Sequence, residues 1–248
     1  TFPRTGLSIR NRTVLAAMTN KQSGHDGVLS DDELEWLAAR ARGGFGIVTT
    51  CAAHVSLDGQ GWDGEMGVFD DGLVPGLTRL ADALRAEGSI SLVQIFHGGV
   101  RAPSRLTGQQ PFSASVFKLE AKDFEVPREA TVEDIEHTIA AFGQAARRCA
   151  EAGFDGIEIH GAHGYLITQF LSPLKNQRTD PYGGSFENRL RFPTELITKV
   201  RDAVGPDVPL TIRMAGNDFV PGSNTDVETP KIAAAYQAAG VDAINVTG

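Results

Sequence analysis

One local pattern recurs five times along this chain and constrains its fold more than any other feature. In each copy an amphipathic helix ends at a glycine or a small residue, a few residues follow, and a short β-branched strand begins. The five copies are ARARGGFGIVTT ending at Thr50, LRAEGSISLVQI ending at Ile95, CAEAGFDGIEIH ending at His160, VRDAVGPDVPLTIR ending at Arg213, and YQAAGVDAINVTG at the C-terminus. Helices that alternate with strands in this way predict an α/β fold with a parallel sheet.

The pattern also predicts where the elements lie. An opening strand is expected at residues 13–18, before the strands of the five copies. The expected helices lie near residues 31–42, 75–87, 131–152, 186–204 and 228–239. The strands are apolar on both faces, as parallel strands covered by helices must be.

Polar residues inside the strands favour a (β/α)8 TIM barrel over an open doubly wound sheet. Because side chains alternate along a strand, Gln94, His160 and Arg213 lie opposite the apolar face and close to the ends of three different strands. A (β/α)8 barrel collects its active-site groups at this end of its strands. No GxGxxG fingerprint follows the opening strand, which argues against a dinucleotide-binding sheet.

Three long loops and the N-terminal segment complete the expected fold. The loops at residues 51–74, 97–130 and 161–185 far exceed the usual length of a connection from strand to helix, and loops of that length usually carry function. Residues 1–13 contain turn signals at Gly6 and Asn11-Arg12, so we expect a small hairpin that closes the bottom of the barrel.

Composition excludes several classes of function. The net charge of -8, without a long run of Lys or Arg, argues against a nucleic-acid partner. No apolar segment approaches the ~20 residues that span a bilayer, so no membrane partner is expected and a cytoplasmic location is predicted. Cys51 and Cys149 fit no metal spacing, and we expect two buried thiols rather than a disulfide.

The segment after the strand that ends at His160 brings together His160, His163 and Tyr165. An HxxH pair suggests a metal, but neither the HExxH context nor a third ligand is evident, so no metal site is predicted. Two imidazoles at a barrel mouth are better suited to polarise one carbonyl or anionic oxygen. Tyr165 could release a proton, although an isolated loop tyrosine is more often a packing ring.

Arg213 needs a partner because a guanidinium inside a strand is costly to bury alone. One interpretation pairs it with Glu158. In a second interpretation, the partner of Arg213 is a delocalised ring system that gains negative charge on reduction. Gln94 could bind the imide edge of such a ring or could bridge backbone groups.

These residues belong to longer motifs: HGAHGYLITQFLSP at 160–173, NQRTDPYGGSFENR at 176–189, Ala17-Met18-Thr19, Gln94 followed by a His-Gly-Gly run at 97–99, and Arg213 after Leu-Thr-Ile. In order and spacing, from about residue 3 to the last residue, the chain resembles the old yellow enzyme family of FMN-dependent ene-reductases and NADH:flavin oxidoreductases. Its motifs are most similar to the bacterial 2,4-dienoyl-CoA-reductase-like branch.

The resemblance implies FMN at the C-terminal mouth of the barrel, reduced by NADH or NADPH in a ping-pong cycle. The positions that it assigns to cofactor binding are Ala17, Met18, Thr19, Ala52, Gln94, His160 and Arg213. It implies that the substrate is a small activated alkene, an α,β-unsaturated carbonyl compound. His160 and His163 would hold the carbonyl oxygen, and Tyr165 would protonate the α-carbon.

The sequence departs from the family pattern at several points. Ala17 replaces a common Pro, Val100 displaces Arg101 by one position in the usual HGGR, and Lys21 stands where some relatives have Tyr. After Asn245-Val246 the strands seven and eight of the family are absent. We therefore expect residues 1–248 to form a single FMN-binding barrel domain, truncated after strand six, with two exposed sheet edges.

Two other functions remain open from the sequence alone. One is a non-catalytic barrel fragment or assembly piece that retains no flavin. Its exposed sheet edges leave open whether several copies of the chain associate as a homo-oligomer. The other is a flavin-free lyase that uses His160 and Tyr165 as acid and base, with Glu158 nearby.

Overall fold

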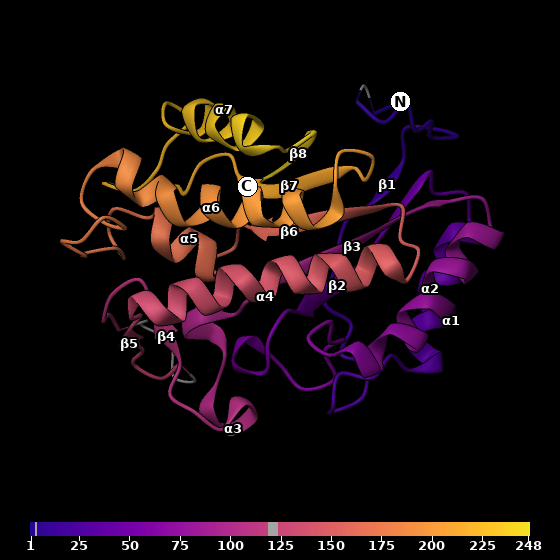
Figure 1. The fold of residues 1–248 in the computed structure, drawn as a ribbon, viewed down its shortest axis with the longest axis horizontal. Helices are drawn as coiled ribbons and strands as arrows, with labels where there is room; N and C mark the ends of the chain where they lie inside the picture. Colours follow the sequence, from indigo (N-terminus) through magenta and orange to yellow (C-terminus); the bar gives the residue numbers. More distant parts are fainter. Residues whose placement is uncertain (3, 119–123) are drawn as a thin grey trace.

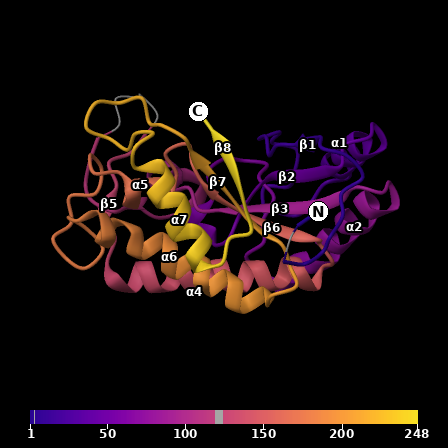
Figure 2. The ribbon, with the colours of Figure 1, turned by 90° about the horizontal axis from the view of Figure 1, so that it is seen from above.

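The computed structural model describes residues 1–2, 4–118 and 124–248 and arranges parallel strands in one curved sheet (Figures 1 and 2). The order in this sheet is β1-β2-β3-β6-β7-β8. Its strands are β1 (Val14–Leu15), β2 (Ile47–His54), β3 (Ile90–Phe96), β6 (Gly156–Gly161), β7 (Leu210–Ala215) and β8 (Ala243–Thr247). A separate short pair consists of β4 (Phe112–Ser113) and β5 (Arg128–Glu129).

Helices connect successive strands and cover the outer face of the sheet (Figure 2). The α-helices are α1 (Asp31–Arg42), α2 (Val74–Ala86), α3 (Ser104–Thr107), α4 (Val132–Glu151), α5 (Leu166–Leu171), α6 (Phe186–Val204) and α7 (Thr229–Ala239). Short 3-10 segments are η1 (Leu57–Gly59), η2 (Asp71–Leu73) and η3 (Gly99–Arg101). The five helices predicted from the pattern are confirmed, with ends within one or two residues.

Three of these helices begin at a side chain that caps free backbone N–H groups. Ser30 and Ser185 accept from the third residue of α1 and α6, and Thr131 forms a capping box with Asp134 at the start of α4. Caps of this kind stabilise a helix end by about 1 kcal/mol each. The sequence therefore fixes where these helices start.

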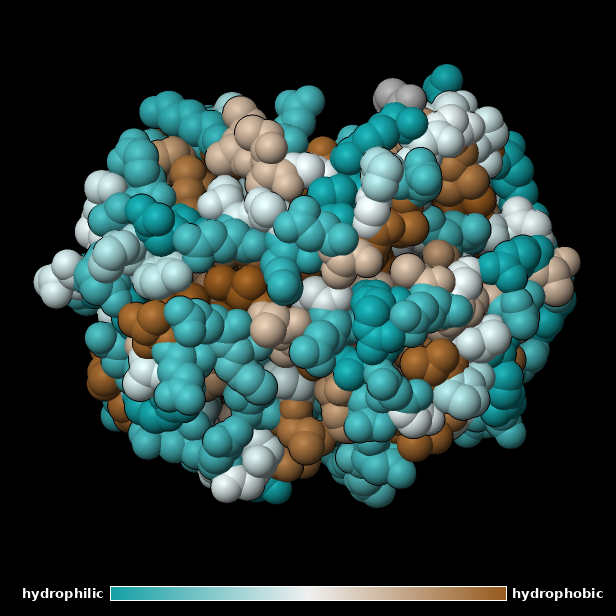
Figure 3. All heavy atoms as spheres, in the orientation of Figure 1, coloured by the Kyte–Doolittle hydropathy of each residue, from teal (hydrophilic) through white to brown (hydrophobic). Residues whose placement is uncertain are grey.

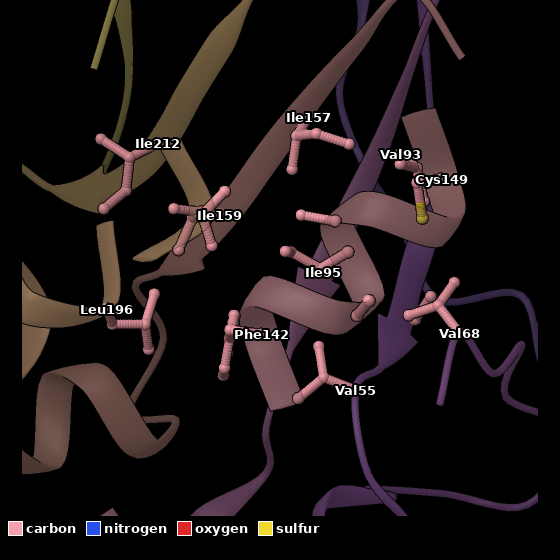
Figure 4. Packing of buried hydrophobic residues seen from close by; sticks show 14 of the residues in the cluster. Val55, Val68, Val93, Ile95, Phe142, Cys149, Ile157, Ile159, Leu196 and Ile212 are labelled. Atoms are coloured by element: carbon pink, nitrogen blue, oxygen red, sulfur yellow. The ribbon is translucent and has the colours of Figure 1, made fainter. Parts of the chain in front are cut away.

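The hydrophobic core lies between the outer face of the sheet and the helices that cover it (Figure 4). Ile95, Ile157 and Ile212 point from three neighbouring strands toward Phe142 of α4 and Leu196 of α6, and all five side chains are almost fully buried. Burying a side chain of this size contributes roughly 1.5–3 kcal/mol. The apolar face predicted from strand alternation is thus confirmed, and it leaves the polar face for the interior of the barrel.

The opening strand is shorter than predicted. The ladder between β1 and β2 pairs Val14 with Ile47 and Leu15 with Val48 and then ends. Directly afterwards, β2 shifts its register against β3 between Thr49 and Ala52. The prediction of a strand over residues 13–18 is therefore wrong for most of its length, because only Val14 and Leu15 pair with a neighbouring strand.

The N-terminal segment forms a turn, not the predicted hairpin. Phe2 N–H donates to Leu7 O at 2.9 Å and Gly6 N–H donates to Phe2 O at 2.9 Å, but no strand is formed within the described part of residues 1–13. Phe2 is 7% exposed and packs with Ile47 and Leu92. The segment therefore does cover the bottom of the sheet, through one aromatic side chain.

The curved sheet leaves a space of about 320 Å³ between its edge strands β1 and β8. Val14, Leu92, Ala243 and Asn245 are among the residues that line it. Figure 3 shows a notch at the upper edge of the molecule, between the C-terminal elements and the N-terminal segment. The sheet is therefore an open, partial barrel.

Two predictions about composition can also be compared with the structure. Cys51 and Cys149 are buried free thiols, as expected. Within the described residues, no helix is both long enough and apolar enough to cross a membrane.

Candidate active site

The parallel register places polar side chains from neighbouring strands in two layers inside the barrel. In the lower layer Gln94 of β3 pairs with Glu158 of β6. In the upper layer His160 of β6 pairs with Arg213 of β7, and Arg213 pairs with Asn245 of β8. Residues paired across parallel strands point to the same face, so Gln94, His160 and Arg213 all face the interior of the barrel, in two adjacent layers.

A β-bulge in β2 brings Ala52 into the same arrangement. Thr49 pairs with Leu92, but the next pair is Ala52 with Gln94, so β2 contains one extra residue. Thr50 Oγ1 accepts the backbone N–H of Gln94 at 3.2 Å across the bulge. Bulges often redirect backbone near active sites, and this one sets a small side chain opposite Gln94.

Glu158 is held by two amide side chains, not by Arg213. Gln94 Nε2 donates to Glu158 Oε1 at 2.7 Å, and Asn245 Nδ2 donates to Oε2 at 3.1 Å. Burial raises the pKa of Glu158, while the hydrogen bonds from Asn245 and Gln94 act in the opposite direction. The interpretation that pairs Arg213 with Glu158 is therefore wrong as a direct contact: two closer amide donors take up the carboxylate.

Arg213 has a guanidinium that is only partly satisfied. Its Nη1 donates to the carbonyl oxygen of Ala17 at 3.1 Å, and its Nη2 lies 3.5 Å from Thr247 Oγ1. Its Nε is buried and, within the described residues, has no hydrogen-bond partner. A buried donor of this kind costs free energy unless a ligand accepts from it. The environment of Arg213 thus fits an anionic or carbonyl-bearing ring.

The loop after β1 lies against this guanidinium. Ala17 is 8% exposed and supplies the carbonyl that Arg213 contacts. Met18 is 54% exposed and Thr19 is also exposed, and both directly follow Ala17 in the chain. The structure therefore brings all seven residues predicted to bind the cofactor to the same end of the sheet.

His160 is a buried, neutral hydrogen-bond donor. Its Nδ1 accepts the backbone N–H of Ala162 at 3.3 Å, which leaves the proton of the neutral ring on Nε2. Burial lowers the pKa of His160 to about 3, and the charges of His163 and Arg213 act in the same direction. The ring is therefore neutral near pH 7, and its Nε2–H can donate one hydrogen bond to a ligand.

His163 and Tyr165 surround the His160 ring. The ring centroids lie 5.1 Å and 4.9 Å from that of His160, both in edge-to-face arrangement. His163 has a positive φ of 57°, and its Nε2 lies 3.2 Å from Thr247 Oγ1. Burial raises the pKa of Tyr165 and lowers that of His163. The three rings predicted to carry the chemistry thus form one cluster.

Several neighbours of the site were not singled out from the sequence. Phe96 packs edge-on to Tyr165 at 5.1 Å, and Trp62 stacks on Phe96 at 5.2 Å. Asn245 contacts Glu158, and Thr247 contacts both Arg213 and His163. Alternation along β8 could have identified Asn245 and Thr247, because they lie on the same face as Arg213; no sequence signal indicated Trp62.

A metal site is not formed by the parts of the chain that the structure describes. No group of three or more His, Cys, Asp or Glu side chains there is placed to hold an ion. The second imidazole of the HxxH pair instead bonds Thr247.

The chain is similar to known proteins over nearly its whole length. Residues 5–247 match the model of the NADH:flavin oxidoreductase / NADH oxidase family. A metal reductase from Desulforamulus reducens is 43% identical over 244 residues, 98% of this chain and 36% of that protein. The chain spans 36% to 53% of the length of three curated relatives that it matches.

Solved structures show the same fold. A complex of 2-naphthoyl-CoA reductase with 2-naphthoyl-CoA has a TM-score of 0.95 at 36% identity and covers 98% of this chain and 39% of that chain. Morphinone reductase bound to tetrahydroNAD has a TM-score of 0.89 at 27% identity and covers 98% of this chain and 71% of that chain. The (β/α)8 prediction and the resemblance to old yellow enzyme are confirmed. The chain belongs to the FMN-dependent NADH:flavin oxidoreductase / NADH oxidase family.

Proposed function

We propose that this chain supplies the active site of an FMN-dependent reductase that uses NADH or NADPH to reduce the activated C=C bond of α,β-unsaturated carbonyl compounds. The observation that carries the proposal is the neutral His160, whose Nε2–H is free to donate beside His163 and Tyr165. Residues 1–248 would act as one flavin-binding domain. When bound, FMN would supply the hydride acceptor and donor.

The residues at the upper rim would hold the flavin. Arg213 offers a cation and a buried Nε–H that has no hydrogen-bond partner among the described residues, and both would suit the part of the ring that becomes negative on reduction. Gln94 lies one layer below, with its amide nitrogen held by Glu158, and Ala52 faces it across the bulge. Ala17, Met18 and Thr19 would line the ring edge from the loop after β1.

His160 and His163 would bind the carbonyl oxygen of the substrate. Negative charge grows on that oxygen when hydride reaches the β-carbon, so fixed hydrogen-bond donors stabilise the transition state more than the ground state. A neutral imidazole donates without first losing or gaining a proton. Burial of His160 thus prepares the ring for this role at neutral pH.

Tyr165 would then protonate the α-carbon. Its ring packs against His160 and Phe96, which fixes its direction relative to the carbonyl site. Because burial raises its pKa, the hydroxyl keeps its proton until a strong base, the carbanion of the enolate, is formed beside it.

The names of similar structures support this class of substrate. One was solved with 2-naphthoyl-CoA, which carries a carbonyl next to unsaturated carbon, and another, a morphinone reductase, was solved with tetrahydroNAD. For this chain both the alkene and the nicotinamide reductant are proposals.

The test is spectroscopic. Purified protein should be yellow, should bleach under anaerobic conditions when NADH or NADPH is added, and should regain its colour when an enone such as 2-cyclohexenone follows. Protein that stays colourless and takes up no FMN when it is supplied would contradict the proposal. Protein that bleaches but never reoxidises with any enone, enal or unsaturated thioester would contradict its substrate class.

A further inference from the structure

The side chain of Gln169 joins the two loops that form the mouth of the barrel. It is 3% exposed. Its Nε2 donates to Gly164 O at 2.8 Å and to Gly98 O at 3.3 Å, and its Oε1 accepts the N–H of Val100 at 3.2 Å. Because a buried amide is costly to leave unpaired, these bonds fix the loop after β3 against the loop that carries Tyr165. We call this arrangement the Gln169 clamp.

Gly99 lets the clamp close. Its φ is +59°, and a Cβ at this position would lie 2.3 Å from Gln169 Oε1. The short turn η3 begins at this glycine and ends at Arg101. The clamp therefore sets the direction in which the Arg101 side chain leaves the backbone.

Arg101 points toward the ring of Tyr165. Its Cζ lies 5.6 Å from the Tyr165 ring centroid and 5.3 Å from that of Phe124. Its Nε is buried and, within residues 4–118 and 124–248, has no hydrogen-bond partner. A cation so placed interacts favourably with an anion that forms nearby, since the low local dielectric strengthens their attraction.

We propose that Arg101, directed by the Gln169 clamp, is a positioning residue that stabilises the phenolate formed when Tyr165 gives its proton to the α-carbon. This inference rests on the proposed function. In the step, the Oη–H bond breaks, its electron pair stays on Oη, and a C–H bond forms at the α-carbon of the enolate. The negative charge thereby moves from the substrate to Tyr165, and water later returns the proton.

Other charges around Tyr165 do not take this role. Glu65, from the loop after β2, is buried, and its charge would oppose a phenolate. His160 and His163 are neutral near pH 7, because burial lowers the pKa of both. Arg213 would face the flavin. Within the described residues, Arg101 is therefore the cation that lies against the Tyr165 ring.

The kinetic test compares three substitutions in the purified protein. Arg101→Met should slow alkene reduction about tenfold, as expected for the loss of a charge at this distance, and should leave flavin reduction by NADH unchanged. Arg101→Lys should restore most of the rate. Lys175→Met is the matched control: it removes a cation from the same groove, where Lys175 lies over Phe117 at 4.6 Å, and should have no effect.

A double mutant separates this role from a merely structural one. In a Tyr165→Phe background, Arg101→Met should cause no further loss, because no phenolate can form. An equal loss with and without the tyrosine would overturn the proposal. Gln169→Met should reproduce the Arg101→Met effect in weaker form, which keeps the test available if Arg101→Met does not fold.

A readout without turnover completes the experiment. In protein labelled with ¹³C at tyrosine Cζ, the signal that disappears in Tyr165→Phe belongs to Tyr165. Its pKa should be higher in Arg101→Met than in the wild type and unchanged in Lys175→Met. An unchanged Tyr165 pKa in Arg101→Met would overturn the inference. Failure of alkene reduction in the wild type would overturn the proposed function alone, since the titration measures the pair directly.

Discussion

His160 pairs in register with Arg213 on the neighbouring strand, so a neutral imidazole and a permanent cation share one layer of the barrel interior. The cation disfavours a second positive charge beside it, although burial is the larger reason that the pKa of His160 falls to about 3. In the function that we propose, His160 would be the neutral donor for the substrate, and Arg213 would supply the positive charge for the flavin. The chemistry we propose depends on this division.

The depressed pKa of His160 predicts a pH dependence of stability. The unfolded chain binds a proton at this ring below about pH 6.5, whereas the folded chain does not, so stability falls as the pH decreases from 6.5 toward 3. At pH 5 the contribution should be about 2 kcal/mol below its value at pH 7. Chemical unfolding of the wild type and of His160→Asn at both pH values measures it. Buried carboxyl groups titrate equally in both proteins, so an identical pH slope would contradict the prediction.

Arg213 should control the flavin. Arg213→Met removes the cation and the unpaired Nε–H, so the Kd for FMN should rise about tenfold or more. The two-electron potential should become more negative by roughly 30 mV for each factor of ten lost in affinity of the reduced over the oxidised flavin. Equilibrium dialysis and a redox titration provide the measurements. Arg12→Met, at an exposed position remote from the rim, is the control and should change neither value.

Substitution of Gly99 and of Gly108 by alanine gives a matched comparison of the stability that the Gln169 clamp contributes. Both have positive φ, +59° and +74°, but a Cβ at Gly99 would meet Gln169 whereas nothing lies within 4 Å of one at Gly108. Gly108→Ala should cost only the backbone strain, about 1 kcal/mol, and Gly99→Ala should cost roughly 1–3 kcal/mol more because the clamp must open. Thermal unfolding measures both changes. Equal losses would show that the clamp does not constrain this loop.

The sequence alone predicted those structural features that depend on residues close to one another in the chain. The alternation of helices and strands predicts the five helices to within two residues, and strand alternation places Gln94, His160 and Arg213 on one face. Each of these predictions needs only neighbouring residues in the chain.

Features that depend on distant partners could not be predicted in the same way. The length of β1 depends on its ladder with β2, which has only two residue pairs, and the partners of Glu158 come from the distant strands β3 and β8. Trp62 and Gln169 lie in or beside long loops, where neither hydrophobic period nor turn chemistry specifies a tertiary contact.

The central claim, that His160 and His163 act on the substrate carbonyl, is tested most directly by rapid-mixing kinetics of the two half-reactions in the His160→Asn, His163→Asn double variant. We predict that reoxidation of the reduced flavin by an enone slows by about 100-fold or more, while reduction of the flavin by NADH slows far less. Equal slowing of both half-reactions would contradict the account.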